Sequence, residues 1–172
     1  MNCVYVRNLR LGEGTPKVCI PLVGASDEAL FEEIKALSSY PADLVEWRTD
    51  YMNDIFNEGR LTGLLPRLRK HLGNTPLIFT FRTTKEGGQR QASPQQYKTL
   101  AMEAIASGCI DLIDIELFSD PDSITELTAL AKEKGVKTIF SSHDFYSTPP
   151  AENSCHGCAT WKSWEPILQK SP

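Results

Sequence analysis

Four short apolar segments of this chain each end in a cluster of charged or polar residues, and this pattern limits the possible folds more than any other feature. A parallel strand buried on both faces reads as a nearly continuous apolar run, and ionised groups inside it are costly. Charge that recurs at the carboxyl ends of successive strands is therefore typical of the active-site face of an α/β protein. The four segments are Leu44–Arg48, Leu77–Arg82, Leu112–Glu116 and Thr138–Asp144.

The segments between these predicted strands carry the signals of helices. Ser26 or Asp27 can cap a helix with an apolar stripe on one face. Ser93-Pro94-Gln95-Gln96 has the capping-box pattern, with proline at the first helical position. The pattern predicts about five β/α units of roughly 25 to 35 residues, the size of a parallel crossover unit. The other predicted elements are a strand over Val18–Val23, a helix near Leu61–Leu72 and a helix that starts at Asp120-Pro121 and closes at Gly135.

Two architectures fit alternating strands and helices. An open doubly wound sheet is favoured by a glycine-rich phosphate loop after the first strand, and Val23-Gly24-Ala25-Ser26 has too few glycines for one. Chemistry spread over several strand ends, rather than gathered at one switch point, favours a β/α barrel. We therefore predict an α/β protein of the barrel type, with the open sheet as the alternative.

Composition excludes several classes of function. The chain has 172 residues, with 18 basic and 22 acidic residues and a net charge of −4, and its basic residues are scattered. Binders of nucleic acid or membrane surfaces concentrate positive charge, so neither partner is expected. No apolar stretch is long enough for a membrane span, and the N-terminus lacks the apolar core of a signal peptide. Five cysteines, an odd number, make a disulfide framework improbable and favour a cytoplasmic protein.

His143 and Glu86 are the candidates for acid–base chemistry. An imidazole has an ordinary pKa of ~6.5, which lets it accept and return protons near neutrality. Glu86 lies in a loop with paired glycines, Gly87-Gly88, where the backbone can turn sharply toward a site. A carboxylate there could orient the histidine. The alternatives are a histidine that only bonds a backbone carbonyl and a solvated loop charge.

Arg48 and Arg82 are the candidates for substrate binding. Two guanidinium groups at one face could hold a carboxylate or several hydroxyls. Glu46 could accept a hydroxyl or instead neutralise Arg48. Asp114 and Glu116 share a face of their strand and could be partners of the arginines. Cys155-His156-Gly157-Cys158 has a metal-like spacing, but a zinc site needs about four ligands and no second pair follows.

These residues resemble the type I 3-dehydroquinate dehydratases of the shikimate pathway. The resemblance implies a (β/α)8 barrel of about 250 residues, of which this chain would form an incomplete part. It also implies a lyase that dehydrates the small molecule 3-dehydroquinate to 3-dehydroshikimate, with no metal or cofactor, in a homodimer. The matching motifs are Asn8-Leu9, Gly12-Glu13-Gly14-x-Pro16-Lys17, Glu46-Trp47-Arg48, Phe79-Thr80-Phe81-Arg82, Lys85-Glu86-Gly87-Gly88, Asp114-Ile115-Glu116-Leu117 and Ser142-His143-Asp144-Phe145.

The resemblance also implies roles for individual residues. In the family, a lysine amine forms an imine (Schiff base) with the substrate ketone, which makes the neighbouring C–H acidic. His143 would take that proton and return one to the leaving hydroxyl, and Glu86 would orient His143. Pro21 stands where some members carry a serine that faces the substrate. The residues that match substrate-binding positions are Glu46, Trp47, Arg48 and Arg82.

The end of the chain departs from the family pattern. The family lysine lies on the strand after the histidine, in a context like Ile-Pro-Lys-Ile-Ala, whereas Lys170 is followed only by Ser171-Pro172. An exposed lysine with an ordinary pKa of ~10.4 stays protonated and is a poor nucleophile. Reading the codons from their third base permits a family-like sequence from Ser154 onward, which points to a frameshift.

We therefore predict a partial type I dehydroquinase barrel over residues 1–152 and an out-of-frame tail over residues 153–172. Without the imine lysine in its usual context, the chain is expected to lack dehydratase activity. The alternatives are a non-catalytic remnant that binds a shikimate-like carboxylic acid, a misfolded product, and a metal-binding tail around Cys155 and Cys158.

Overall fold

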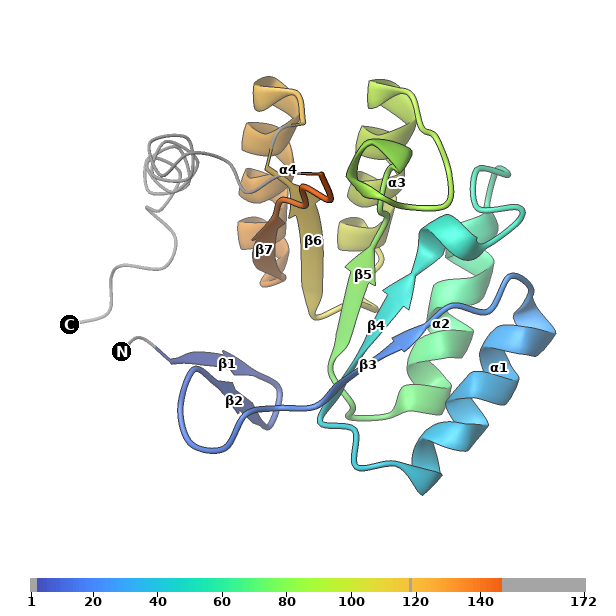
Figure 1. The fold of residues 1–172 in the computed structure, drawn as a ribbon, viewed down its shortest axis with the longest axis vertical. Helices are drawn as coiled ribbons and strands as arrows, with labels where there is room; N and C mark the ends of the chain where they lie inside the picture. The colour runs from blue at the N-terminus through green and yellow to red at the C-terminus, as the bar shows by residue number, and fades with distance from the viewer. Residues whose placement is uncertain (1–2, 118, 147–172) are drawn as a thin grey trace.

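The computed structural model describes residues 3–117 and 119–146 (Figure 1). Within these ranges a parallel five-stranded sheet has the order β3-β4-β5-β6-β7, and a helix connects each of the first four strands to the next. The strands are β3 (Cys19–Leu22), β4 (Leu44–Arg48), β5 (Leu77–Thr80), β6 (Leu112–Glu116) and β7 (Lys137–Ser141). The helices are α1 (Asp27–Ala36), α2 (Arg60–Leu72), α3 (Pro94–Ala106) and α4 (Pro121–Lys134).

The strand order confirms the barrel architecture over the open doubly wound sheet. Neighbouring strands follow one another in sequence, so the described sheet has no point at which the order reverses. The helices pack on one face of the sheet, where their apolar residues form a single core with strand residues such as Val45, Phe79 and Ile113. The described residues are thus an incomplete β/α barrel with its helices outside.

Alternate residues of each strand face opposite sides, which separates the barrel interior from the helix layer. On β4, Val45 and Trp47 join the helix-facing core, and Leu44 joins a second, inner cluster with Ile78 and Leu112. Farther along the inner face the apolar side chains give way to polar ones. The interior is therefore apolar where the strands begin and polar where they end.

The helix ends follow the predicted signals. The Ser26 hydroxyl accepts the Ala29 N–H at the start of α1, and Ser93 forms a complete capping box with Gln96 at the start of α3. Gly135 ends α4 in a left-handed conformation.

Two predicted strands are shorter than expected, because their polar ends leave the sheet. The strand predicted over Leu77–Arg82 ends at Thr80, and the Arg82 N–H donates to an oxygen of Asp50 (3.4 Å) instead of to a neighbouring strand. The strand predicted to reach Asp144 ends at Ser141.

A β-hairpin that the sequence did not predict closes the end of the sheet where the strands begin. Its strands are β1 (Val4–Val6) and β2 (Leu9–Leu11), and their apolar side chains pack on the inner cluster. The carboxylate of Asp111 accepts hydrogen bonds from Arg7 Nε (2.6 Å), Arg69 Nη2 (2.6 Å) and the Leu77 N–H (2.8 Å). This carboxylate ties the hairpin to the sheet and to α2.

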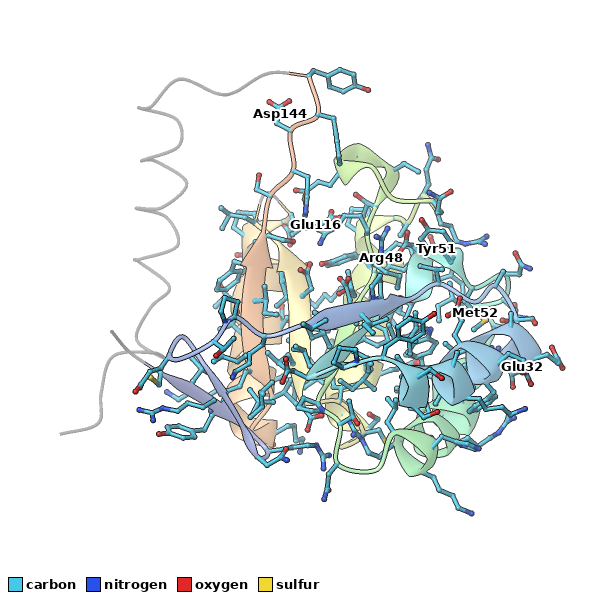
Figure 2. All side chains as sticks on the ribbon, turned by 60° about the horizontal axis from the view of Figure 1, so that its bottom comes forward. Glu32, Arg48, Tyr51, Met52, Glu116 and Asp144 are labelled. Carbon is cyan, nitrogen blue, oxygen red and sulfur yellow. The ribbon has the colours of Figure 1, made fainter. Side chains whose placement is uncertain are left out.

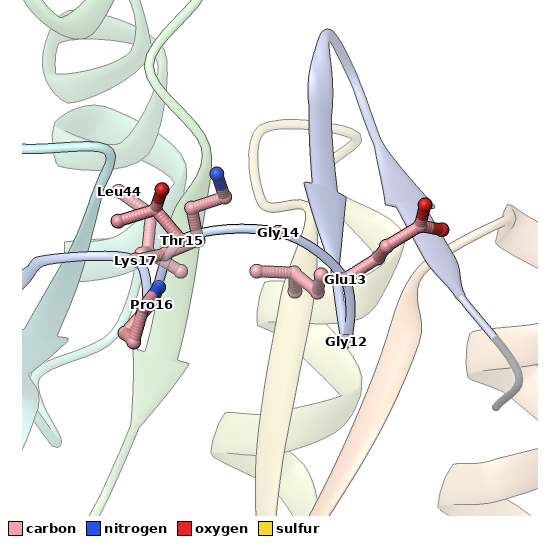
Figure 3. A pocket seen from close by; sticks show the side chains of 8 residues that line it. Gly12, Glu13, Gly14, Thr15, Pro16, Lys17 and Leu44 are labelled. Carbon is pink, nitrogen blue, oxygen red and sulfur yellow. The ribbon is translucent and has the colours of Figure 1, made fainter.

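A pocket of about 790 Å³ lies beside the hairpin, and Leu44 and the Leu11–Lys17 segment line it (Figure 3). It holds none of the predicted site residues. In Figure 2, by contrast, Arg48, Tyr51 and Glu116 lie at the end of the sheet away from the hairpin. The chemistry predicted from the sequence therefore belongs to that end.

Among the residues that the structure describes, no helix has both the length and the apolar character needed to cross a bilayer. The described cysteines, Cys3, Cys19 and Cys109, are free thiols. The predicted boundary at residue 152, Lys170 and the Cys155–Cys158 pair lie outside the described residues.

Candidate active site

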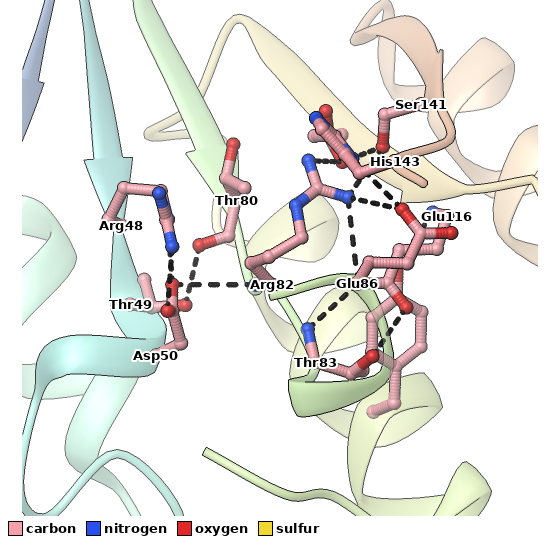
Figure 4. A network of polar contacts seen from close by, with 12 residues as sticks. Arg48, Thr49, Asp50, Thr80, Arg82, Thr83, Glu86, Glu116, Ser141 and His143 are labelled. Atoms are coloured by element: carbon pink, nitrogen blue, oxygen red, sulfur yellow. Dashed lines mark hydrogen bonds and ion pairs between the residues drawn. The ribbon is translucent and has the colours of Figure 1, made fainter. Parts of the chain in front are cut away.

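Arg82 is the centre of a polar network at the carboxyl ends of β5, β6 and β7 (Figure 4). Its side chain is almost fully buried. Nη1 donates to Glu86 (3.2 Å) and to the Ser141 hydroxyl (2.7 Å), and Nη2 donates to Asp114 (3.0 Å). The Ser141 hydroxyl in turn donates to the same oxygen of Asp114 (2.7 Å). One guanidinium group thus joins two strand ends and a loop.

The network holds more negative than positive charge. A third carboxylate, that of Glu116, lies 3.5 Å from Arg82 Nη1. Burial raises the pKa of Asp114, and the Arg82 charge opposes that rise. Burial also raises the pKa of Glu86, while the hydrogen bond with His143 lowers it. Asp114 and Glu86 therefore hold their protons more tightly than exposed carboxyl groups do.

Glu86 and His143 form the predicted pair. Glu86 ends the short 3-10 helix η3 (Thr84–Glu86), and its Oε2 lies 3.0 Å from His143 Nδ1. When Glu86 is ionised, Nδ1 carries the proton and donates to it, and Nε2 is then the nitrogen that can act as a base. The His143 side chain is 42% exposed, so a substrate could reach it.

Glu116 fixes the start of the loop that carries Glu86. Its carboxylate accepts the Thr83 N–H (2.7 Å) and the Thr83 hydroxyl (2.9 Å). Its own N–H donates to the hydroxyl of Tyr97 (3.1 Å), a buried residue of α3. The pair Asp114 and Glu116, left open by the sequence, thus consists of supporting partners of Arg82 and its loop.

Arg48 is held by Asp50, a residue that the sequence analysis missed. Arg48 Nε and Nη2 each donate to one oxygen of Asp50 (both 2.9 Å), and the guanidinium lies over the ring of Tyr51. Asp50 is fully buried and also accepts the Gln89 N–H (3.0 Å). It therefore connects the end of β4 with the segments that follow β5, and the only sequence signal was a carboxylate two residues after Arg48.

Glu46 lies on the same face of β4 as Arg48, because the two are two residues apart on one strand. The expected alternative, a Glu46–Arg48 ion pair, is replaced by the Arg48–Asp50 pair. Glu46 instead acts on its neighbours through charge. Burial, followed by the Glu46 charge, raises the pKa of Cys19 to about 11. Pro21 is the β3 residue in register with Glu46.

Trp47 does not line this site. Its side chain is 0% exposed in the helix-facing core, with its ring edge-on to Phe79 at 5.7 Å. Strand alternation directs it away from Glu46 and Arg48, and this placement corrects the expectation that its side chain contacts substrate. The structure therefore gathers His143, Glu86 and Arg82 in one network, adds Arg48 through Asp50, and leaves Trp47 outside.

Comparisons with known proteins identify the family of the chain. The family model for type I 3-dehydroquinase matches residues 18–168. The 3-dehydroquinate dehydratase of Clostridium novyi is 45% identical over 152 residues, which are 88% of this chain and 60% of that protein. The chain thus spans about 60% of the length of the curated relatives it matches.

Solved structures give the same result. The type I 3-dehydroquinate dehydratase of Clostridium difficile, solved with covalently modified comenic acid, superposes with a TM-score of 0.85 at 39% identity, covering 89% of this chain and 61% of that one. The 3-dehydroquinate dehydratase of Enterococcus faecalis superposes with a TM-score of 0.88 at 37% identity, covering 93% and 67%. The sequence motifs, the incomplete barrel and these matches lead to one conclusion: the chain belongs to the type I 3-dehydroquinase family.

Proposed function

We propose that the described residues supply the substrate-binding and proton-transfer groups for dehydration of 3-dehydroquinate to 3-dehydroshikimate, in the cytoplasm. The observation that carries this proposal is the hydrogen bond between Glu86 and His143, set beside the Arg82 network at the strand ends. A carboxylate that fixes one imidazole nitrogen leaves the other to move a proton. The names of the relatives support the choice of substrate.

The proposed chemistry follows the roles that the family resemblance implies. An imine between a lysine amine and the substrate ketone would withdraw electrons from the adjacent carbon and make its C–H acidic. Nε2 of His143 would take that proton. The electron pair would then expel the hydroxyl, which leaves as water with a proton from His143. Glu86 would hold the imidazole in place and stabilise its charged form.

Both arginines keep donors for the substrate. A guanidinium group has five N–H donors. Described residues use three of them on Arg82 and two on Arg48. Arg48 is also the more exposed of the two, at 21% against 8% for their side chains. We therefore assign the first polar contact with the substrate to Arg48 together with Glu46, and a supporting contact to Arg82.

The imine nucleophile is the remaining requirement. Within residues 3–117 and 119–146, no lysine forms an ion pair with the Arg82 network, and the paired lysines contact glutamates on helices or their ends. The out-of-frame tail expected over residues 153–172 supports the proposal that the 172-residue chain binds its substrate without turning it over.

Borohydride trapping tests the absence of turnover. The chain is incubated with 3-dehydroquinate and sodium borohydride, and its mass is measured. We expect no covalent adduct and no 3-dehydroshikimate absorbance. An adduct on Lys170, or on any other lysine, would show that the chain carries its own nucleophile and would overturn this part of the proposal.

Calorimetric titration with 3-dehydroshikimate tests the binding. Arg48→Ala should weaken binding by roughly 10- to 100-fold, because a hydrogen bond to a charged group contributes about 1.5–3 kcal/mol. The control is Arg67→Ala, which removes a largely exposed arginine that pairs with Asp27 on the helix layer. If both variants bind as the unchanged chain does, or if the unchanged chain binds nothing, the assignment of the site is wrong.

A non-catalytic binder of shikimate-like acids is the second candidate, and it shares this site. Binding without an adduct, the result that we expect, would mean that the chain keeps the site of a dehydratase and acts only as such a binder. A homodimer, which the family resemblance implies, is part of the proposal and is measured by sedimentation.

A further inference from the structure

The aromatic ring of Phe145 packs parallel to the imidazole of His143. The two ring centroids are 6.2 Å apart and the ring planes differ by 12°. Offset parallel rings at this separation attract one another. Phe145 is 68% exposed, so burial in the core does not explain its position.

The edge of the Phe145 ring packs against Gly87. A Cβ added at Gly87 would lie 2.4 Å from Phe145 Cε2 and 2.7 Å from Cζ, closer than real Cβ atoms come. Gly87 directly follows Glu86 and has a φ of +79°, a conformation that favours glycine. Phe145 therefore touches both loops that carry the acid–base pair: its own, with His143, and the next, with Glu86.

Two contacts then restrict the imidazole in different ways. The hydrogen bond from Nδ1 to Glu86 fixes one edge of the ring, and the ring remains free to tilt about that bond. The second side-chain torsion of histidine has a broad range of accessible angles, so a single hydrogen bond does not define the plane. A parallel aromatic neighbour defines it.

We propose that Phe145, seated against Gly87, is a positioning residue that sets the plane of the His143 imidazole and so directs Nε2 toward the substrate. The importance of this orientation rests on the proposed function, in which Nε2 is the base. The orientation itself is a property of the chain without substrate, and it is tested in that state.

The experiment is nuclear magnetic resonance of the imidazole protons in the full chain without ligand. A parallel aromatic ring gives the His143 protons a ring-current contribution to their chemical shifts. Phe145→Leu should remove that contribution, and Phe145→Tyr, which keeps the ring, should retain it. His71, whose ring contacts Phe31 on the helix layer, reports whether the fold is unchanged.

Gly87→Ala should move the His143 resonances in the same sense as Phe145→Leu, because the new methyl group displaces the ring. The atoms it meets are at the far end of a flexible side chain, so the ring yields before the backbone does. Gly59→Ala is the matched control: Gly59 has a similar φ of +72°, but nothing lies within 4 Å of its added Cβ. It imposes the same backbone strain without the contact.

The proposal is overturned if Phe145→Leu leaves the His143 resonances in place while His71 reports an intact fold. It is also overturned if Gly59→Ala shifts them as far as Gly87→Ala does. Failure of the chain to bind 3-dehydroshikimate would count against the proposed function alone, because no step of this experiment uses a ligand.

Discussion

At the scale of single residues, Arg82 is the most consequential side chain of the described site. Among the described residues of the network it is the arginine that contacts three buried carboxylates, and it joins the ends of β6 and β7 to the loop after β5. Removing one partner of a buried ion pair leaves the other charges without compensation, which costs more than the pair itself contributes.

We expect Arg82→Met to lower the free energy of unfolding by about 3–5 kcal/mol, or to prevent folding. The measurement is urea denaturation followed by circular dichroism. The control, Arg67→Met, removes a largely exposed arginine and should cost about 1 kcal/mol or less. Equal losses in the two variants would contradict the central role of Arg82.

The raised pKa of Asp114 predicts how the free energy of unfolding changes with pH. Its folded pKa is raised above the ordinary value of 3.8, so folding favours the protonated form. The stabilisation that protonation contributes is fully present below the unfolded pKa and is lost as the pH rises through the folded pKa. The free energy of unfolding of the unchanged chain, relative to Asp114→Asn, should therefore fall as the pH rises above about 4.

Urea denaturation at a series of pH values measures this difference. Glu103→Gln, on the exposed face of α3, serves as the control for a carboxyl group outside the Arg82 network. A relative stability that rises with pH in the Asp114 comparison would show that attraction to Arg82 outweighs burial.

At the scale of elements, replacing a glycine by alanine should change the stability in opposite directions inside a helix and directly after one. Gly63 lies on the exposed face of α2, and an added Cβ meets nothing within 4 Å. Gly63→Ala should raise the free energy of unfolding by about 0.5–1 kcal/mol. Gly135→Ala, at a φ of +74° after α4, should lower it by about 1–2 kcal/mol. Thermal melts show whether each variant gains or loses stability. A gain in stability in both variants would contradict the assigned conformation of Gly135.

Elements with strong local signals were predicted from the sequence, and those that depend on tertiary contacts were not. The capping box at Ser93 predicted where α3 begins, and Gly135 predicted where α4 ends. The hairpin was missed because its strands have three residues each and its turn places an arginine, Arg7, at a φ of 53° instead of a glycine. Arg7 is held there by Asp111, a contact that no local pattern reveals.

The candidate site shows the same division. Charged strand ends predicted that Arg82 and His143 lie at one edge, because parallel strands end at one edge, and Glu86 was a candidate partner of His143 from its place in a loop with paired glycines. Asp50 and Ser141 were missed because their roles depend on the register between strands. The error at Trp47 was avoidable, since the period of two in a strand already directs it away from its neighbours.

At the scale of the whole molecule, the sheet has two outer strands. Within the described residues, β3 and β7 each pair with one neighbour. Unpaired parallel edges act as templates for association. We therefore expect the 172-residue chain to associate as its concentration rises, as measured by sedimentation velocity. A monomer at all concentrations, with a cooperative thermal transition, would contradict this expectation.

The Arg7–Asp111 contact also affects the order in which the chain can fold during synthesis. The two residues are 104 positions apart. At a synthesis rate of about 5–20 residues per second, Asp111 is made roughly 5–20 s after Arg7. The hairpin is thus made well before the carboxylate that anchors it, and also before Leu44, Ile78 and Leu112, the apolar residues of the inner cluster that it covers.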